Sequence, residues 1–143
     1  GGARLLRTDP RRPEAGHEEQ PLACAATDDL GGALCGTGFG YDADVRAEQG
    51  RVVAGVLPQV RDVRRGGSAA LDLCWVAEGR LDVYYEQGLH EWDLAGAWLV
   101  VTEAGGQVLG LRGSAPADPF TVAGPPALTG MLVPVLEGLV APS

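Results

Sequence analysis

The chain alternates short apolar segments with turns rich in glycine and proline, and this pattern predicts alternating strands and helices. Apolar runs with helical spacing or with capping residues at their ends predict helices over residues 42–58, 69–78, 94–101 and 125–140. Shorter apolar or alternating runs predict strands over residues 21–27, 32–36, 60–65, 80–86, 107–111 and 120–123. The alternation of the two element types predicts an α/β fold with a mixed sheet flanked by helices.

Capping residues define the limits of two of these helices. Ser68 precedes the helix over residues 69–78 as its N-cap, and Gly79 ends it. Asp93 stands directly before the apolar run 94–101, so it is predicted to be the N-cap of that helix. Upstream, residues 8–20 are polar and contain two prolines, which predicts an exposed loop.

Composition and charge narrow the function classes. The chain has 143 residues, a formal net charge of −8 and a pI near 4.6, which argues against a general binder of nucleic acid or anionic membrane. Its three cysteines lack the close paired spacing of a zinc site and are expected to be reduced. No secretory apolar segment opens the sequence, and the run 94–101 is too short to cross a bilayer. These features predict a cytoplasmic protein.

The loop between the strand at residues 80–86 and the helix at 94–101 carries the best candidate chemistry. Glu86 and Asp93 lie on either side of a glycine turn, so the loop can bring two carboxylates to one opening. Paired carboxylates suit Mg²⁺, which prefers oxygen ligands. Spacing alone leaves open the simpler alternative that Asp93 only caps its helix.

Two other segments have plain structural interpretations that are favoured over functional ones. The glycine-rich turn at residues 36–40 follows a predicted strand but lacks the Lys-Ser/Thr of a phosphate-binding P-loop, so an ordinary turn is favoured. Arg61, Arg64 and Arg65 form a local basic patch that can face a phosphate, although a solvated strand face is favoured.

Several motifs together resemble the inositol monophosphatase family. Trp-Asp-Leu-Ala at residues 92–95, followed by Thr-Glu-Ala-Gly-Gly at 102–106, is similar to the C-terminal signature of that family. Gly-Ser-Ala-Ala-Leu-Asp-Leu-Cys at residues 67–74 and Tyr-Tyr-Glu at 84–86 look like the segment that precedes the signature. Gly-Phe-Gly at residues 38–40 resembles a glycine turn of the family, and the resemblance covers almost the whole chain.

The sequence departs from the family pattern in one decisive respect. The main metal motif of the family, Asp-Pro-x-Asp-Gly-Thr, does not occur, because Asp9-Pro10 and Asp118-Pro119 both continue differently. A smaller departure is Gly96-Ala97, where many members have Ala-Gly. The resemblance therefore implies the C-terminal portion of a layered α-β-α-β-α sugar-phosphatase fold. Residues 1–41 would be the end of an N-terminal sheet region with a connecting loop, and residues 42–143 a substrate-side α/β domain.

The resemblance implies Mg²⁺-dependent hydrolysis of a phosphate monoester, either inositol monophosphate or a similar small polyol phosphate. Carried over by position, Asp93 would be a metal ligand that also touches a substrate hydroxyl, and Glu86 would accept hydrogen bonds from substrate hydroxyls. The backbone of Gly67, Ser68 and Ala69 would line the polyol side. The family also implies a homodimer in the full-length form, whereas the isolated chain is expected to be inactive.

Other roles stay open from the sequence. Trp92 is expected to pack and fix Asp93, and His90 has a structural role as readily as a functional one. One alternative function is a non-catalytic fragment or assembly module, since the main metal motif is missing. Another is a related phosphatase acting on histidinol phosphate, fructose bisphosphate or adenosine bisphosphate.

Overall fold

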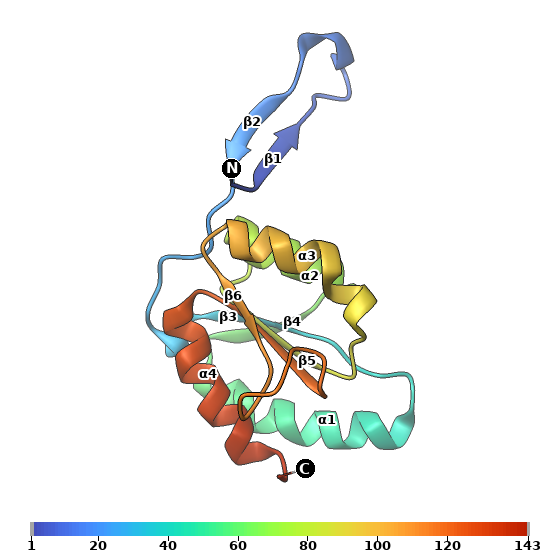
Figure 1. Cartoon of the computed structure of the whole chain (residues 1–143), viewed down its shortest axis with the longest axis vertical. Helices are drawn as coiled ribbons and strands as arrows, with labels where there is room; N and C mark the ends of the chain where they lie inside the picture. The colour runs from blue at the N-terminus through green and yellow to red at the C-terminus, as the bar shows by residue number, and fades with distance from the viewer. Residues whose placement is uncertain (1, 143) are drawn as a thin grey trace.

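The computed structural model describes residues 2–142, which form a mixed five-stranded sheet between two pairs of helices, with a separate two-stranded hairpin (Figure 1). The strands are β1 (Arg4–Arg7), β2 (Glu18–Pro21), β3 (Leu34–Thr37), β4 (Asp62–Arg65), β5 (Val83–Gln87), β6 (Gln107–Leu109) and β7 (Phe120–Gly124). The α-helices are α1 (Ala43–Val56), α2 (Ala69–Glu78), α3 (Glu91–Glu103) and α4 (Pro126–Leu139), and short 3-10 helices cover Pro13–Ala15, Leu30–Gly32 and Leu57–Gln59.

The order of the strands places three loops side by side. The sheet runs β4-β3-β5-β7-β6, with β3 parallel to both β4 and β5, and with β7 antiparallel to β5 and β6. Thr37 at the end of β3 lies opposite Arg65 of β4 and Tyr85 of β5. Because parallel strands end at the same edge of a sheet, the segments that follow β3 and β4 meet Glu86 at that edge.

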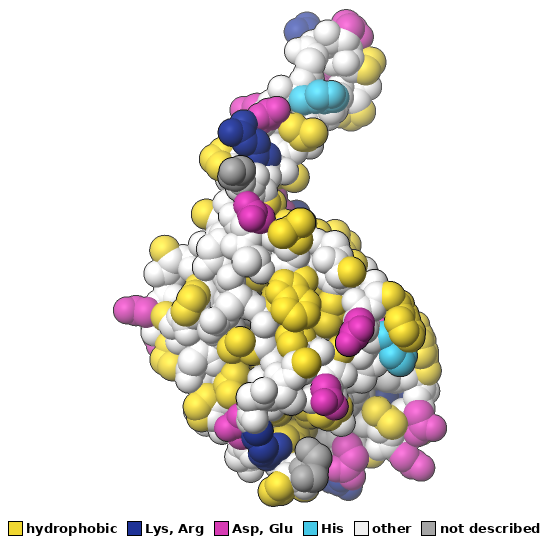
Figure 2. All heavy atoms as spheres, in the orientation of Figure 1, with side chains coloured by type: hydrophobic (Ala, Val, Ile, Leu, Met, Phe, Trp, Pro, Cys, Tyr) yellow, Lys and Arg dark blue, Asp and Glu magenta, His cyan; other side chains and the backbone are white. Residues whose placement is uncertain are grey.

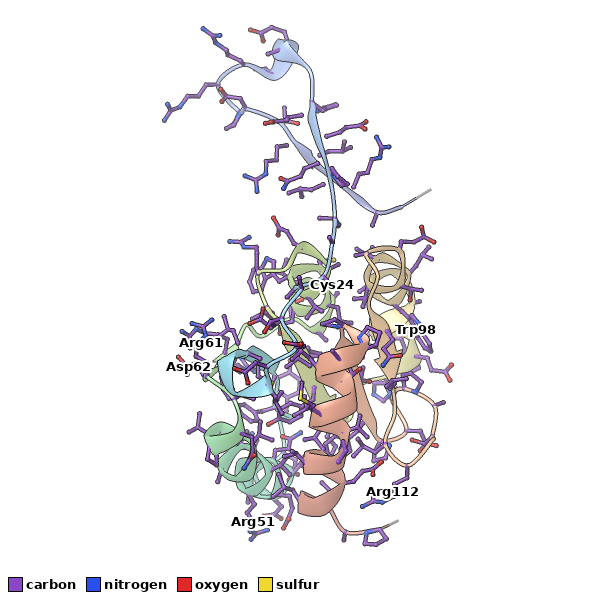
Figure 3. All side chains as sticks on the ribbon, turned by 90° about the vertical axis from the view of Figure 1, so that its left-hand side faces the viewer. Cys24, Arg51, Arg61, Asp62, Trp98 and Arg112 are labelled. Carbon is purple, nitrogen blue, oxygen red and sulfur yellow. The ribbon has the colours of Figure 1, made fainter. Side chains whose placement is uncertain are left out.

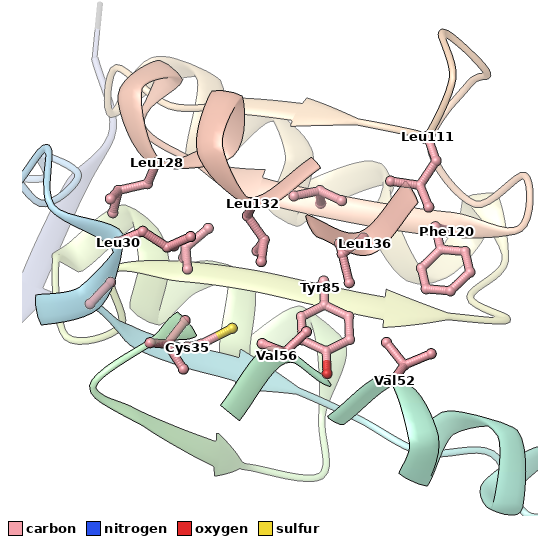
Figure 4. Close-up of a cluster of buried hydrophobic side chains, with 14 residues drawn as sticks. Leu30, Cys35, Val52, Val56, Tyr85, Leu111, Phe120, Leu128, Leu132 and Leu136 are labelled. Atoms are coloured by element: carbon pink, nitrogen blue, oxygen red, sulfur yellow. The ribbon is translucent and has the colours of Figure 1, made fainter. Parts of the chain in front are cut away.

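Each face of the sheet is covered by one pair of helices. Alternate side chains of β5 point to opposite faces, so Tyr85 joins the core beneath α1 and α4 while Tyr84 joins the core beneath α2 and α3. Figure 4 shows the first core, whose labelled members are Leu30, Cys35, Val52, Val56, Tyr85, Leu111, Phe120, Leu128, Leu132 and Leu136. The three layers confirm the predicted α/β class with a mixed sheet flanked by helices.

The loop that follows β6 is fastened to the end of α4. Arg112 donates hydrogen bonds from its guanidinium to the carbonyls of Glu137 and Val140, both at 2.9 Å (Figure 3). The Arg112 N–H also donates to the carboxylate of Glu137 at 2.6 Å. These bonds satisfy carbonyls at the C-terminal end of the helix, which have no partner within it.

The β1–β2 hairpin projects from the body of the molecule and carries many charged side chains (Figures 1 and 2). It meets α2 through an ion pair between Arg7 and Glu78 at 3.5 Å. Beyond it, the Leu22 N–H donates to the Ala3 carbonyl at 2.9 Å, and the Cys24 N–H donates to the Ala104 carbonyl at 3.0 Å. Residues 22–27 therefore connect the hairpin to the body.

The N-terminal predictions need correction. Of the strand predicted over residues 21–27, only Pro21 lies in a strand, at the end of β2. The backbone of residues 22–27 bonds to separate parts of the molecule and forms no strand. The loop predicted over residues 8–20 instead contains a 3-10 turn at Pro13–Ala15 and most of β2. The expected division after residue 41 places β3 with the N-terminal part. In the structure, β3 pairs with β4 and β5.

Elsewhere the predicted elements are found. The helix α2 begins with Ser68, whose hydroxyl accepts a hydrogen bond from the Leu71 N–H at 3.3 Å, and ends at Gly79 with a φ of 76°. The predicted strand at residues 60–65 is found as β4, which lies at the edge of the sheet. Cys24, Cys35 and Cys74 are free thiols. Within residues 2–142, no helix is both long and apolar enough to cross a membrane.

Candidate active site

The five residues predicted for the site line one cavity. Gly67, Ser68, Ala69, Glu86 and Asp93 surround a space of about 590 Å³ at the edge of the sheet where the parallel strands end. The first three belong to the turn into α2, whose opening N–H groups have no carbonyl partner one turn earlier in the helix. The predicted meeting of Glu86 and Asp93 at one opening is therefore found in the structure.

Glu86 lies near the end of β5 and is held close to neighbouring groups. The Tyr84 hydroxyl donates a hydrogen bond to its carboxylate. Burial raises the pKa of Glu86, while the hydrogen bond from Tyr84 and the charge of Arg65 oppose that rise. The carboxylate also lies against Gly38, where an added Cβ would be only 2.2 Å from Oε2. A glycine after β3 thus makes room for this carboxylate.

Asp93 differs in local structure from the prediction. The helix α3 begins at Glu91 with His90 as N-cap, so Asp93 is the third residue of the helix and not its cap. Its Oδ2 accepts a hydrogen bond from the His90 N–H at 3.0 Å. A carboxylate at this third position can bond back to the N–H of the cap residue, which is why the helix starts earlier than the apolar run.

The prediction that Trp92 packs into the body of the molecule and fixes Asp93 is wrong. Its side chain is 75% exposed and stacks on His90 with 4.3 Å between ring centroids. Both rings line the cavity. The position of Asp93 is fixed instead by its hydrogen bond to the backbone of His90.

Two further charged residues of the cavity were not assigned a role from the sequence. Arg65 ends β4, and its guanidinium lies over Gly67, with Nη1 3.0 Å from the position of an added Cβ. Asp72 is only 2% exposed, and its Oδ2 has no hydrogen-bond partner among the described residues. Burial, together with the charge of Glu86, raises the pKa of Asp72 to about 6. The signal in the sequence was an acid inside an otherwise apolar helix.

The described residues do not form a complete metal site. Within residues 2–142 there is no group of three or more His, Cys, Asp or Glu side chains that could hold a metal ion. Mg²⁺ requires near-octahedral oxygen coordination and is usually bound by one or two carboxylates together with substrate phosphate and water. Asp93 fits one position of such a site, and the remaining ligands would have to come from elsewhere.

Comparison with known proteins decides the family. A family model described as the inositol monophosphatase family matches residues 10–140. The chain belongs to the inositol monophosphatase family. The resemblance inferred from residues 67–106 is thereby confirmed.

Relatives and solved structures agree with this assignment. Inositol-1-monophosphatase SuhB of Mycobacterium tuberculosis is 57% identical over 88 residues, covering 62% of this chain and 30% of the relative. Inositol-1-monophosphatase of Mycobacterium leprae is 47% identical over 120 residues, covering 82% of this chain and 41% of the relative. The structure of Mycobacterium tuberculosis SuhB matches with a TM-score of 0.76 and 47% identity, covering 88% of this chain and 49% of that one. The chain thus spans half or less of the length of these family members.

Proposed function

We propose that the chain forms the substrate-side part of a Mg²⁺-dependent phosphate monoester hydrolase that acts on inositol monophosphate or a similar small polyol phosphate. Membership of a family of phosphatases supports the class of reaction. The observation that carries the proposal is the meeting of Glu86, Asp93 and the turn at residues 67–69 around one cavity.

The proposed roles follow from the chemistry of these groups. Asp93 uses Oδ2 to accept a bond from the backbone, and its carboxylate would supply one ligand to Mg²⁺. Bound Mg²⁺ would lower the pKa of a coordinated water and stabilise negative charge on the phosphate and leaving oxygens. Glu86, oriented by Tyr84, would accept a hydrogen bond from a hydroxyl of the substrate. The opening N–H groups of α2 would face the same ligand.

A phosphate-release assay tests this function. We expect that the chain, joined to an N-terminal portion that carries the Asp-Pro-x-Asp-Gly-Thr motif, hydrolyses inositol 1-phosphate with Mg²⁺ and stops when the metal is chelated. The 143-residue chain alone is expected to be inactive, because residues 2–142 do not contain a complete set of metal ligands. Absence of phosphate release from the joined protein would contradict the proposal.

Replacing Gly38 with Ala tests the position of Glu86. The added Cβ would lie 2.2 to 2.5 Å from three atoms of the Glu86 carboxylate, so the carboxylate must move away. Because the carboxylate moves away from the hydroxyl of the buried Tyr84, we expect a loss of stability of about 1 kcal/mol. We also expect a loss on the order of tenfold in kcat/KM for inositol 1-phosphate. Gly50→Ala is the matched control, because nothing lies within 4 Å of its added Cβ. Equal activity of the two variants would argue against the role of Glu86.

Some relatives carry a different name, which keeps the assembly alternative open. A Nus factor SuhB of Xylella fastidiosa is 44% identical over 97 residues, covering 67% of this chain and 35% of the relative. Isothermal titration of the chain with Mg²⁺ tests this alternative. We expect weak binding, because one or two carboxylates seldom hold Mg²⁺ without substrate phosphate. Tight, stoichiometric binding by this chain alone would count against a purely non-catalytic module.

The identity of the substrate is a separate matter. Phosphatases for histidinol phosphate, fructose bisphosphate and adenosine bisphosphate are the alternatives, and Glu86 with the turn at residues 67–69 favours a polyol. A panel of these four substrate types on the joined protein would rank them. The homodimer and the cytoplasmic location stay predictions.

A further inference from the structure

Two carboxylates lie in neighbouring positions above the ends of parallel strands. Gly38 follows β3 and Gly66 follows β4, and the pairing of Thr37 with Arg65 puts these glycines side by side. The Glu86 carboxylate lies against Gly38, and the Asp72 carboxylate lies against Gly66, where an added Cβ would be 2.2 Å from Oδ1. Adjacent strands are about 5 Å apart, so the two acids occupy adjacent positions across the cavity.

The two glycines make these positions available from different elements. Glu86 comes from β5, whereas Asp72 comes from the first turn of α2 and reaches back over the residue that follows β4. A side chain at either glycine would fill the space that the carboxylate now takes. Both acids line the same cavity, which also contains the turn at residues 67–69.

Asp72 lacks a partner that would explain its burial. It is 2% exposed, and its Oδ2 is cut off from solvent without a hydrogen bond from any described residue. A buried carboxylate oxygen without a donor is unfavourable, so such groups in native proteins usually meet a ligand, an ion or an ordered water. By contrast, the Glu86 carboxylate accepts a hydrogen bond from the Tyr84 hydroxyl.

The charge of Arg65 favours the ionised form of both acids. Its guanidinium lies over Gly67 in the same cavity and lowers the pKa of Asp72 and Glu86, against the effect of burial. An ionised carboxylate accepts hydrogen bonds and donates none. The pair is therefore suited to a ligand that presents two donors from neighbouring atoms, as the hydroxyls of a polyol do.

We propose that Asp72 is a second hydroxyl-binding residue, which acts with Glu86 to hold two hydroxyl groups of one polyol at the ends of β4 and β3. This inference rests on the proposed function, which assigns a polyol phosphate to the cavity. Asp72 then determines substrate specificity and takes no part in the metal chemistry. The Asp72 carboxylate lines the cavity and has no hydrogen-bond donor among the described residues, so the substrate hydroxyl supplies one.

The test compares two phosphate esters in the joined protein that carries the metal motif. Inositol 1-phosphate has the hydroxyls, whereas p-nitrophenyl phosphate has none to offer. For Asp72→Ala and Asp72→Asn we expect kcat/KM to fall on the order of 10- to 100-fold with inositol 1-phosphate. With p-nitrophenyl phosphate it should change by less than about twofold, which also shows that the variants fold.

Asp44→Asn is the matched control, since Asp44 is also an acid in the first turn of a helix but does not line the cavity. The Asp44→Asn variant should have the same kcat/KM as the wild type with both esters. A second measurement uses inositol phosphates that each lack one hydroxyl. For the wild type, the analogue that lacks the hydroxyl bound by Asp72 should have a lower kcat/KM than inositol 1-phosphate. For Asp72→Ala, the same analogue and inositol 1-phosphate should have nearly equal kcat/KM, because the interaction is already lost.

The outcomes separate the two proposals. Equal losses with both esters, or no loss with inositol 1-phosphate, would overturn the role of Asp72 while leaving the phosphatase function in place. If the wild type cleaves p-nitrophenyl phosphate but not polyol phosphates, the role of Asp72 fails together with the choice of substrate. If the wild type cleaves neither ester, the proposed phosphatase function itself fails, and the role of Asp72 with it.

Discussion

Replacing Asp93 with Asn is expected to lower kcat for inositol 1-phosphate by about 100-fold or more in the joined protein. The amide has no charge and is a weaker ligand for Mg²⁺ than a carboxylate. Its oxygen can still accept the hydrogen bond that the His90 N–H now gives to Oδ2, so the start of α3 should be preserved. The loss should therefore appear in turnover and in the Mg²⁺ concentration required, while the melting temperature changes little.

Glu91→Gln provides the control for this substitution. Glu91 is also an acid in the first turn of α3, and it does not line the cavity. Removing its charge should change kcat by less than about twofold, since the effect of a helix-end charge is small. Undiminished turnover of Asp93→Asn, or an equal loss in Glu91→Gln, would overturn the role of Asp93 as a metal ligand.

The sequence predicted the fold best where local signals and tertiary structure agree. Ser68 and Gly79 bound α2 as expected, because a capping hydroxyl and a left-handed glycine act through neighbouring backbone atoms. The N-terminal strand over residues 21–27 failed for the opposite reason. Those residues are apolar enough for a strand, but their backbone partners are Ala3 and Ala104, which the local pattern cannot identify.

The start of α3 shows how a local signal can be misread. The apolar run begins at Leu94, so the pattern alone predicts that the acid before it is the cap. The acid bonds backwards to His90 instead, and this adds a polar first turn that carries Trp92 into the cavity wall. Helix boundaries shift in this way when the third residue supplies the capping group.

The site was only partly predictable from the sequence. The spacing of Glu86 and Asp93 around a glycine turn predicted that the loop between β5 and α3 brings their carboxylates together. The resemblance to the family predicted the contribution of the turn at residues 67–69. Neither the spacing nor the resemblance predicted a role for Asp72. Its role depends on the position of its carboxylate against Gly66 and on the lack of a hydrogen-bond donor to its Oδ2 among the described residues. Neither property follows from the order of residues.

Between pH 4 and pH 7 the wild type is expected to lose about 2 kcal/mol more of its free energy of unfolding than Asp72→Asn loses. Burial raises the pKa of Asp72 from its ordinary value of 3.8 to about 6. Between these values the folded chain holds a proton that the unfolded chain releases, so the contribution of Asp72 to stability falls as pH rises and is lost above about pH 6. The Asn side chain has no proton to lose in this range. The free energy of unfolding of the Asp72→Asn variant should therefore fall less than that of the wild type between pH 4 and pH 7.

Urea unfolding at pH 4, 5, 6 and 7, followed by tryptophan fluorescence, measures this difference. The wild type and Asp72→Asn should differ least at pH 4 and most at pH 7, whereas Asp44→Asn should follow the wild type throughout. Parallel curves for the wild type and Asp72→Asn would show that Asp72 is solvated or paired when folded. A smaller loss of stability between pH 4 and pH 7 without the carboxylate, together with a loss of polyol turnover, is the combination expected of a residue kept for binding. A purely structural acid would show the reverse, because its removal would weaken the fold and affect both phosphate esters alike.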